Sequence, residues 1–445
     1  MALGSEHYDE LAQWVEQGGG SLNPAVEIYH DEVTKGSFRV RDGYQIKEGD
    51  AIVTLPLSRS LSFLNAVSGH PDMPAIPYLN IAKPENSPYF PKDFLEKTPP
   101  HVVGRFFLMQ QYLLGRDGLW WPYFQTLPPP EHMGGSLPAI WPSDDVEFLD
   151  GTNAYVAVQE IKSTLKKEFK HAMKLLPDSF SSAYSRPLYL WAYSIFTSRS
   201  FRPSLILPST NLSGLSCNVD DFSILLPLFD IGNHSLSAKS SWSTDPGGQA
   251  CKLQSGQHYT SGDQVFNNYG MKTNVELLLG YGFMLPESPD FHNDYIHIKT
   301  KAKTEAGDLT STHLVSLRPL RDPSSFVGRS RLLTPDLAQT LECFSHIEDS
   351  LVVSLYETIS RGAATENGGV GVCDIMQGNI PAGLKEKIIN ALGSKLSLDL
   401  EEIEAHDPQY APSNRNQQLA LHYREQCKKV LERALTTLAA HVGES

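Results

Sequence analysis

Apolar and polar residues alternate along two segments near the start of the chain, 26–31 and 36–56, with turn residues such as Gly43 and Gly49 between the runs. A period of two is typical of half-buried β-strands. Before these segments, residues 8–16 have the pattern of a short helix that ends at a run of three glycines. The sequence therefore predicts that the chain opens with a helix followed by β structure.

Helical periodicity replaces this alternation further along the chain. Apolar residues recur every three or four positions in 106–116, 156–176 and 186–199, and proline-rich stretches separate these segments. Such spacing places the apolar side chains on one face of a helix. Because strand-like runs return over about 205–285, the sequence predicts a helical insertion at about 65–195 inside a β domain.

Two long helices are expected in the last part of the chain. Thr334 followed by Pro335 has the residue types of a helix start, and apolar periodicity continues through 351–359. A second periodic stretch covers 413–440. These patterns predict a separate helical domain after the β structure.

The domain prediction follows from these changes of pattern. The β domain with its helical insertion is expected at 20–300 and the helical domain at 301–445. The polar stretch 235–256 predicts a mobile loop within the first of them.

Composition and charge narrow the class of protein. The chain has 445 residues, of which 40% are hydrophobic and 20% charged, so it can bury a sizeable core. Its net charge of -14 argues against direct binding of nucleic acid, because such proteins concentrate Lys and Arg against the phosphate backbone. A basic protein or peptide is a better-matched partner, and we expect the chain itself to act as a monomer.

The cysteines and the N-terminal residues indicate a reducing compartment. The 5 cysteines are scattered and form no Cys-x-x-Cys pair, so neither a disulfide framework nor a metal site is expected. The first twenty residues contain acidic side chains and no continuous apolar stretch, which argues against a signal peptide. No run of about 18 apolar residues predicts a membrane span. We expect a cytoplasmic or nuclear protein, or one found in both.

Four short motifs carry candidate chemistry. They are Lys35-Gly36-Ser37-Phe38, Thr197-Ser198-Arg199-Ser200-Phe201, Asp230-Ile231-Gly232-Asn233-His234-Ser235, and Tyr269-Gly270 followed by Tyr281-Gly282-Phe283. Each alone has an ordinary explanation, namely a hairpin glycine, a solvated arginine, a hydrogen-bonded histidine or a packed tyrosine. Their order and spacing together favour a functional site.

With these motifs, the chain resembles the SET-domain methyltransferases, and specifically the branch that contains plant Rubisco large-subunit methyltransferase and the fungal ribosomal-protein lysine methyltransferases. The resemblance covers nearly the whole chain. It implies an α+β fold, in which a SET domain of small β-sheets has a pseudoknot and a helical insertion and is followed by an all-α C-terminal domain. That last domain resembles the substrate-binding domain of Rubisco methyltransferase.

The resemblance also implies S-adenosylmethionine as the cofactor and assigns residues to it. Arg199 is expected to hold the carboxylate end of the cofactor. Asn233 and His234 match the Asn-His pair that binds it through side chain and backbone, and Phe283 is expected to pack beside the adenine.

A loop made of Thr34, Lys35 and Gly36 matches the first cofactor-binding loop of the family. Relatives usually carry Gly-x-Gly there, whereas this chain has Thr34 at the position of the first glycine. A Cβ at that position can obstruct close approach between the backbone and the cofactor.

Three further residues are expected at the substrate and the methyl-transfer centre. Tyr269 aligns with the catalytic tyrosine, Tyr281 with a residue that lines the channel for the substrate side chain, and Asp230 with a position near the substrate amine. Methyl transfer from a sulfonium needs a neutral amine, and deprotonating lysine at neutral pH costs about 4–5 kcal/mol. Desolvation beside the positive sulfonium lowers that pKa, so no metal is required.

The leading interpretation is a protein-lysine N-methyltransferase that acts on a non-histone protein, with ribosomal proteins as one candidate class. Histidine or a small molecule is an alternative substrate for the same motifs. A catalytically silent SET scaffold that binds a protein partner is the alternative from a different class, and the altered loop at Thr34 is the reason to consider it.

Overall fold

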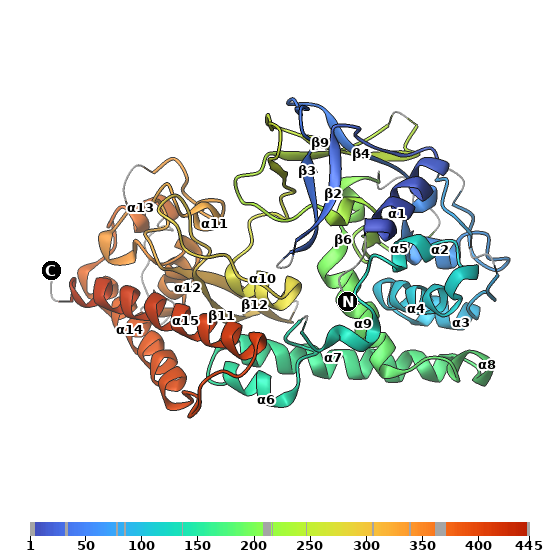
Figure 1. The fold of residues 1–445 in the computed structure, drawn as a ribbon. Coiled ribbons are helices and arrows are strands. Elements are labelled where there is room, and N and C mark those ends of the chain that lie inside the picture. Colours follow the sequence, from blue (N-terminus) through green and yellow to red (C-terminus); the bar gives the residue numbers. More distant parts are fainter. Residues whose placement is uncertain are drawn as a thin grey trace. The chain divides into compact units, whose positions relative to one another are not determined.

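The computed structural model describes residues 5–31, 34–76, 79–83, 86–135, 137–207, 215, 217–245, 247–304, 307–337, 340–360 and 371–442. The chain forms two compact units. The first unit comprises Met1–Met133 and Ser163–Gly270, and the second comprises Gly134–Lys162 and Met271–Ser445. Figure 1 shows the elements of both units.

Three small antiparallel sheets form the β structure of the first unit. The first sheet has the strand order β1-β4-β9-β8. The second has the order β10-β3-β2, and the third has the order β5-β7-β6. The strands are β1 (Ser21–Leu22), β2 (Val26–Asp31), β3 (Lys35–Val40), β4 (Ala51–Pro56), β5 (Leu61–Ser62), β6 (Ser200–Phe201), β7 (Ile224–Leu225), β8 (Ser240–Thr244), β9 (Ala250–Ser255) and β10 (Gln264–Val265). Strands from before and after the predicted insertion therefore pair with one another.

Helices fill the sequence between β5 and β6, as the periodicity predicts. The helices of the first unit are α1 (Ser5–Gln17), α2 (Phe63–Val67), α3 (Lys92–Lys97), α4 (Pro100–Leu113), α5 (Trp121–Phe124), α8 (Asp178–Ser181) and α9 (Arg186–Arg199). Helix α7 (Asn153–Leu175) contributes its first ten residues to the second unit and the rest to the first. Aromatic residues dominate this core, with Trp120, Trp191 and Phe106 fully buried.

The second unit is mostly helical. Its elements are α6 (Ser143–Val146), α10 (Asn274–Tyr281), β11 (Tyr295–Thr304), β12 (Gly307–Ser316), α11 (Phe326–Arg329), α12 (Asp349–Ser360), α13 (Val372–Met376), α14 (Ala382–Ala405) and α15 (Arg415–Ala439). Figure 1 shows α14 and α15 side by side, in orange and red. Apolar residues such as Leu396, Tyr423 and Val430 form its core with Ile298 and Val315 of the hairpin.

This hairpin qualifies the expectation that everything after residue 300 is helical. β11 and β12 pair in register from Tyr295↔Ser316 to Thr304↔Gly307, so residue 301 lies inside a strand of the second unit. The predicted domain limits at 20–300 and 301–445 stay a prediction, as does the pseudoknot.

Two local predictions are wrong. The stretch 235–256 is not one loop, because β8 and β9 form an antiparallel pair within it, and the inward side chains Cys251 and Leu253 are buried there. No helix begins at Thr334, since α12 begins at Asp349. The Thr334 hydroxyl donates to the Asp349 carboxylate over 2.8 Å, so Thr334 binds the first residue of a later helix.

Asn274, the first residue of α10, makes several buried hydrogen bonds within the second unit. Its side chain is fully buried. Its Nδ2 donates to the Leu285 carbonyl, Asp294 Oδ1 and Gln426 Oε1 over 3.0, 2.7 and 3.1 Å, and its Oδ1 accepts the Leu285 N–H over 2.9 Å.

We expect Asn274→Ala to lower the free energy of unfolding by about 2–4 kcal/mol, because several buried polar groups lose their partners. Urea denaturation of the full chain measures this loss. The exposed Asn390 of α14 supplies the control, since Asn390→Ala should change the free energy by less than about 0.5 kcal/mol. Equal effects of the two substitutions would contradict the assignment.

Candidate active site

A buried ion pair lies at the end of α9. Arg199 is the last residue of that helix, and its Nη1 donates to Asp230 Oδ2 over 3.1 Å and to the Asp230 carbonyl over 3.3 Å. The Asp230 side chain is 2% exposed and that of Arg199 is 26% exposed. Burial alone would lower the pKa of Arg199, but the neighbouring Asp230 carboxylate and Tyr123 raise it above its ordinary value.

Tyr123 of α5 completes this cluster. Its hydroxyl donates to Asp230 Oδ2 over 2.9 Å, and its side chain is fully buried. Burial raises the pKa of Asp230 above its usual range, although Arg199 and the hydrogen bond from Tyr123 oppose the shift. Burial and the nearby Asp230 charge raise the pKa of Tyr123 well above its usual range. The cluster therefore holds Arg199 protonated, while burial raises the pKa of the carboxyl that pairs with it.

Asn233 is tied to the β2–β3 hairpin. Its Nδ2 donates to Ser37 Oγ over 2.5 Å and to Gln264 Oε1 over 3.2 Å. Ser37 Oγ is also 2.9 Å from the hydroxyl of Thr34, which donates to Asp31 Oδ1 over 3.0 Å. Thr34, predicted as an obstruction, thus belongs to the hydrogen-bond chain that fixes Asn233.

Gly36 is the position of close approach in this hairpin. A Cβ there would lie 2.7 Å from the hydroxyl oxygen of Tyr8, on α1, so the Tyr8 ring occupies the space that a side chain would need. Burial raises the pKa of Tyr8, and the charges of Arg199 and Asp230 act on the same hydroxyl in opposite directions. The Tyr8 hydroxyl of α1 therefore lies near both Gly36 of the hairpin and the ion pair.

Tyr269 and His234 form a stacked pair. Their ring centroids are 5.0 Å apart with an interplanar angle of 15°. His234 Nδ1 accepts the backbone N–H of Tyr269 over 3.1 Å, and the Tyr269 hydroxyl donates to the Gly232 carbonyl over 2.9 Å. These contacts hold the Tyr269 hydroxyl beside the backbone that links Asp230 to Asn233.

Two residues near these groups have left-handed backbone conformations without being glycine. Lys35 has φ of 69° and Leu228, two residues before Asp230, has φ of 78°. Such conformations cost about 1–3 kcal/mol and concentrate at functional sites. At Leu228, full burial of the side chain holds the turn that delivers Asp230.

The remaining predicted residues, Tyr281 and Phe283, lie in the second unit. Tyr281 ends α10, Gly282 follows it with φ of 75°, and the rings of Tyr281 and Phe283 meet edge to face with centroids 6.2 Å apart. The first unit thus brings together Thr34, Lys35, Gly36, Arg199, Asp230, Asn233, His234 and Tyr269. Their relation to Tyr281 and Phe283 stays a prediction.

Sequence reasoning missed Tyr8, Ser37 and Tyr123. Ser37 belongs to the first of the four motifs, and its place in a predicted strand was the available signal. Tyr8 and Tyr123 lie in helices far from every motif, and only tertiary packing brings them to the cluster.

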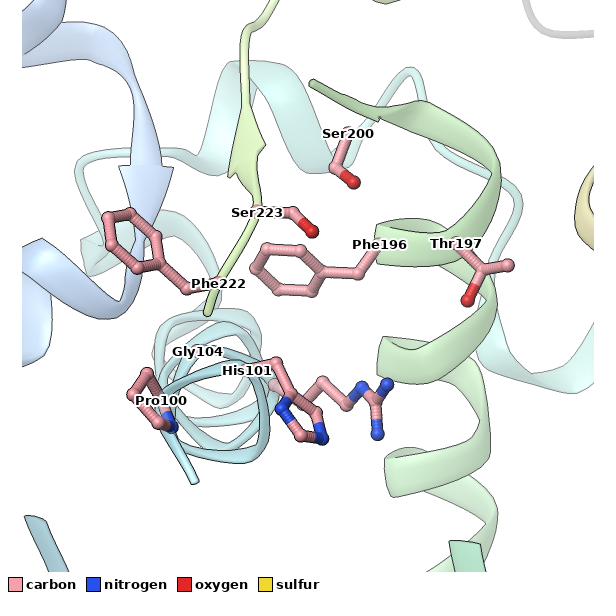
Figure 2. A pocket seen from close by; sticks show the side chains of 9 residues that line it. Pro100, His101, Gly104, Phe196, Thr197, Ser200, Phe222 and Ser223 are labelled. Carbon is pink, nitrogen blue, oxygen red and sulfur yellow. The ribbon is translucent and has the colours of Figure 1, made fainter. Parts of the chain in front are cut away.

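A cavity of about 170 Å³ lies elsewhere in the first unit. Figure 2 shows the Ser200 and Ser223 hydroxyls on one side of the Phe196 ring. Arg105 also lines the cavity, but Glu168 accepts from it over 2.7 Å and already balances its charge. None of the predicted site residues lines this cavity, so we assign it no role.

The described residues hold neither a cluster of metal ligands nor a membrane-spanning helix. No group of three or more His, Cys, Asp and Glu side chains in that part of the chain is placed to hold a metal ion. Within the same residues, every helix is too short or too polar to cross a bilayer.

Comparisons with known proteins find protein N-methyltransferases among the relatives of this chain. The ribosomal lysine N-methyltransferase set10 of Schizosaccharomyces pombe is 29% identical over 453 residues, which covers 98% of this chain and 73% of that protein. The protein-lysine N-methyltransferase EFM1 of Saccharomyces cerevisiae is 23% identical, over 62% of this chain and 49% of its own length. The actin-histidine N-methyltransferase of Homo sapiens is also 23% identical, over 77% of this chain and 52% of its own length. No family model matches the chain.

Solved structures show the same likeness in the fold. The SET domain of LSMT bound to methyllysine and AdoHcy superposes with a TM-score of 0.66 at 14% identity, covering 98% of this chain and 92% of that one. Rubisco LSMT bound to AdoMet has a TM-score of 0.61 at 15% identity, with the same coverage. The predicted α+β fold class and the predicted resemblance to SET-domain methyltransferases are confirmed.

The contact between Gly36 and Tyr8 generates a test of the site. We expect Gly36→Ala to destabilise the first unit by about 1–3 kcal/mol, because the added Cβ meets the Tyr8 hydroxyl. Tyr8→Phe removes the atom at 2.7 Å but leaves ring carbons at 3.1 and 3.2 Å, so it should recover part of the loss. Urea denaturation of both single variants and the double variant measures this. An equal penalty with and without the Tyr8 hydroxyl would contradict the contact.

Proposed function

We propose that this chain, a SET-fold protein with protein-lysine N-methyltransferases among its relatives, is an S-adenosylmethionine-dependent protein-lysine N-methyltransferase. The single observation that carries the proposal is the cluster in the first unit, where Arg199, Asp230, Asn233, His234 and Tyr269 come together in the order of the family motif. The relatives named as lysine methyltransferases support both the reaction and the cofactor.

The residues of the cluster fit S-adenosylmethionine. Arg199 offers a protonated guanidinium, 26% exposed, for a carboxylate. Gly36 lacks a Cβ, which would meet the Tyr8 side chain, and Asn233 is held to the same hairpin through Ser37. When bound, the cofactor supplies a methyl group on a positively charged sulfur.

The chain's own residues would align and prepare the substrate amine. The Tyr269 hydroxyl donates its proton to the Gly232 carbonyl, so its oxygen can accept a hydrogen bond from an incoming amine. The stacked His234 ring prevents Tyr269 from turning away. The lysine proton leaves to solvent before transfer, so positioning and desolvation supply the rate enhancement.

A protein substrate is supported by the relatives, and we propose a non-histone protein, with ribosomal proteins as the first class to test because set10 of Schizosaccharomyces pombe is named for them. We also propose that the chain acts as a monomer in the cytoplasm, the nucleus or both, and binds no nucleic acid directly. The net charge of -14 favours a basic protein segment as its partner.

Calorimetric titration with S-adenosylmethionine tests the cofactor assignment. Wild type should bind, and Arg199→Met should raise the dissociation constant by about 10- to 100-fold, because it removes a charge-assisted hydrogen-bond donor. Arg202→Met is the matched control, since Arg202 is exposed three residues further on and should leave binding unchanged.

A folded wild type that binds no cofactor would favour the silent scaffold instead. Incubation of ribosomal proteins with labelled cofactor, followed by amino-acid analysis, then identifies the product. Methyllysine supports the proposal, whereas methylhistidine would move the chain to the chemistry of the actin-histidine relative.

Steady-state kinetics test the role of Tyr269. We expect Tyr269→Phe to lower kcat about 100-fold with little change in the KM for the cofactor, because the hydroxyl acts on the amine. The wild-type rate should rise with pH, since the lysine must lose a proton from a pKa of about 10.4 in solution. A KM effect without a kcat effect would assign Tyr269 to cofactor binding.

A further inference from the structure

Arg199 is bound on one side only. Both of its side-chain hydrogen bonds come from Nη1 and both end on Asp230. Among the described residues, no partner contacts Nε or Nη2, and the side chain is 26% exposed. Those two nitrogens form the edge of a guanidinium that grips a carboxylate bidentately. Arg199 is thus hydrogen-bonded to Asp230 through Nη1, while Nε and Nη2 stay available to bind a carboxylate.

Asp230 would ordinarily compete for that edge. Its carboxylate is 2% exposed, and a buried carboxylate gains most by taking two donors from one arginine. In this structure only Oδ2 is engaged, and Oδ1 is buried without a hydrogen-bond partner among the described residues. Something therefore limits Asp230 to one nitrogen of Arg199.

Tyr123 supplies that limit. Its hydroxyl donates to Oδ2, the same oxygen that accepts from Arg199, so Oδ2 already has two donors and only one of them is a guanidinium nitrogen. We propose that Tyr123, a residue of the helical insertion, is a positioning residue that keeps the outer edge of Arg199 free for the carboxylate of the cofactor.

The surroundings of Tyr123 give its hydroxyl one orientation. Tyr123 is fully buried on the short helix α5. Trp120, three residues before Tyr123, is also fully buried, and its Nε1 donates to the carbonyls of Arg59 and Ser60 over 3.1 and 3.2 Å. The segment that carries α5 is thus anchored to the turn after β4, and the fully buried Tyr123 side chain keeps its hydroxyl on Asp230.

The inference rests on the proposed function, because it names what the positioning of Arg199 serves. Without the Tyr123 hydroxyl, Asp230 keeps its charge but loses a donor, and it can recover one by drawing a second nitrogen of Arg199 inward. Arg199 would then offer fewer donors to an incoming carboxylate. The expected loss is in cofactor affinity, and the chemical step is spared.

Calorimetric titration with S-adenosylmethionine, using the full chain, tests this. Tyr123→Phe should raise the dissociation constant about 5- to 20-fold, raise the KM for the cofactor in parallel, and leave kcat at saturating cofactor nearly unchanged. A crystal structure of this variant should show two nitrogens of Arg199 on Asp230 in place of one.

Tyr189→Phe is the matched control. Tyr189 is another fully buried tyrosine, on the same helix as Arg199, and its hydroxyl donates to the Glu168 carboxylate over 2.8 Å in an ion pair with Arg105. Its loss should shift the denaturation midpoint to a similar extent as Tyr123→Phe. The affinity for S-adenosylmethionine should stay within twofold of wild type.

Two further measurements separate positioning from a general structural role. In the Asp230→Asn background, Tyr123→Phe should change the dissociation constant less than twofold, because the competing charge is gone. The effect of Tyr123→Phe should also shrink as the pH falls through the raised pKa of Asp230. The groups that act on this carboxyl are Arg199, Tyr123 and, on α1, Tyr8.

The outcomes distinguish the positioning role of Tyr123 from the binding of S-adenosylmethionine by the wild type. Unchanged affinity in Tyr123→Phe, or an equal loss in Tyr189→Phe, would overturn the positioning role while wild-type binding leaves the proposed function standing. A wild type that binds no S-adenosylmethionine would overturn both.

Discussion

The pair formed by the partly exposed Arg199 and the buried Asp230 carboxylate is the constraint on which the first unit's site depends. Taking a carboxylate and a guanidinium out of water costs several kcal/mol for each ion, and the cost is recovered only when further hydrogen bonds satisfy the pair. Here Tyr123 supplies one such bond and the Asp230 carbonyl another. The left-handed turn at Leu228 precedes Asp230, and α9 ends at Arg199. Together they place the two side chains within hydrogen-bonding distance.

A second network fixes the residues around that pair. Asn233 is held through Ser37 to the hairpin that carries Thr34 and Gly36. The next residue, His234, stacks on Tyr269, whose hydroxyl donates to the Gly232 carbonyl. The segment from Asp230 to His234 is therefore anchored at both ends by partners that lie far away in sequence. Such anchoring fixes side chains before a ligand arrives, which is the property that alignment of reacting atoms requires.

The helical insertion contributes a hydrogen bond to this site. Strands from both sides of it pair to complete the small sheets, so the insertion leaves the β domain and returns to it. Tyr123 then reaches back to Asp230. An insertion that hydrogen-bonds the central carboxylate links the stability of the helices to the geometry of the ion pair.

The sequence by itself determined which elements form and which motifs mark the site. Alternation over 26–31 and 36–56 and the helical period in 186–199 and 413–440 correspond to β2, β3, β4, α9 and α15, because local periodicity reports which face is buried. The motif order identified Arg199, Asp230, Asn233, His234 and Tyr269. Periodicity failed where a side chain was used over a distance, as at Thr334, and where polar residues formed an edge pair, as in β8 and β9.

Only the tertiary structure decided the partners of those residues. Tyr8 and Tyr123 carry no signal in the sequence, because a buried tyrosine in a helix reads as ordinary core, and their hydroxyls find Gly36 and Asp230 through packing across more than a hundred positions in one case. The role of Thr34 was reversed for the same reason, since a Cβ that suggests an obstruction carries a hydroxyl that the fold uses. A hydrogen bond depends on distance in space, which a linear pattern does not contain.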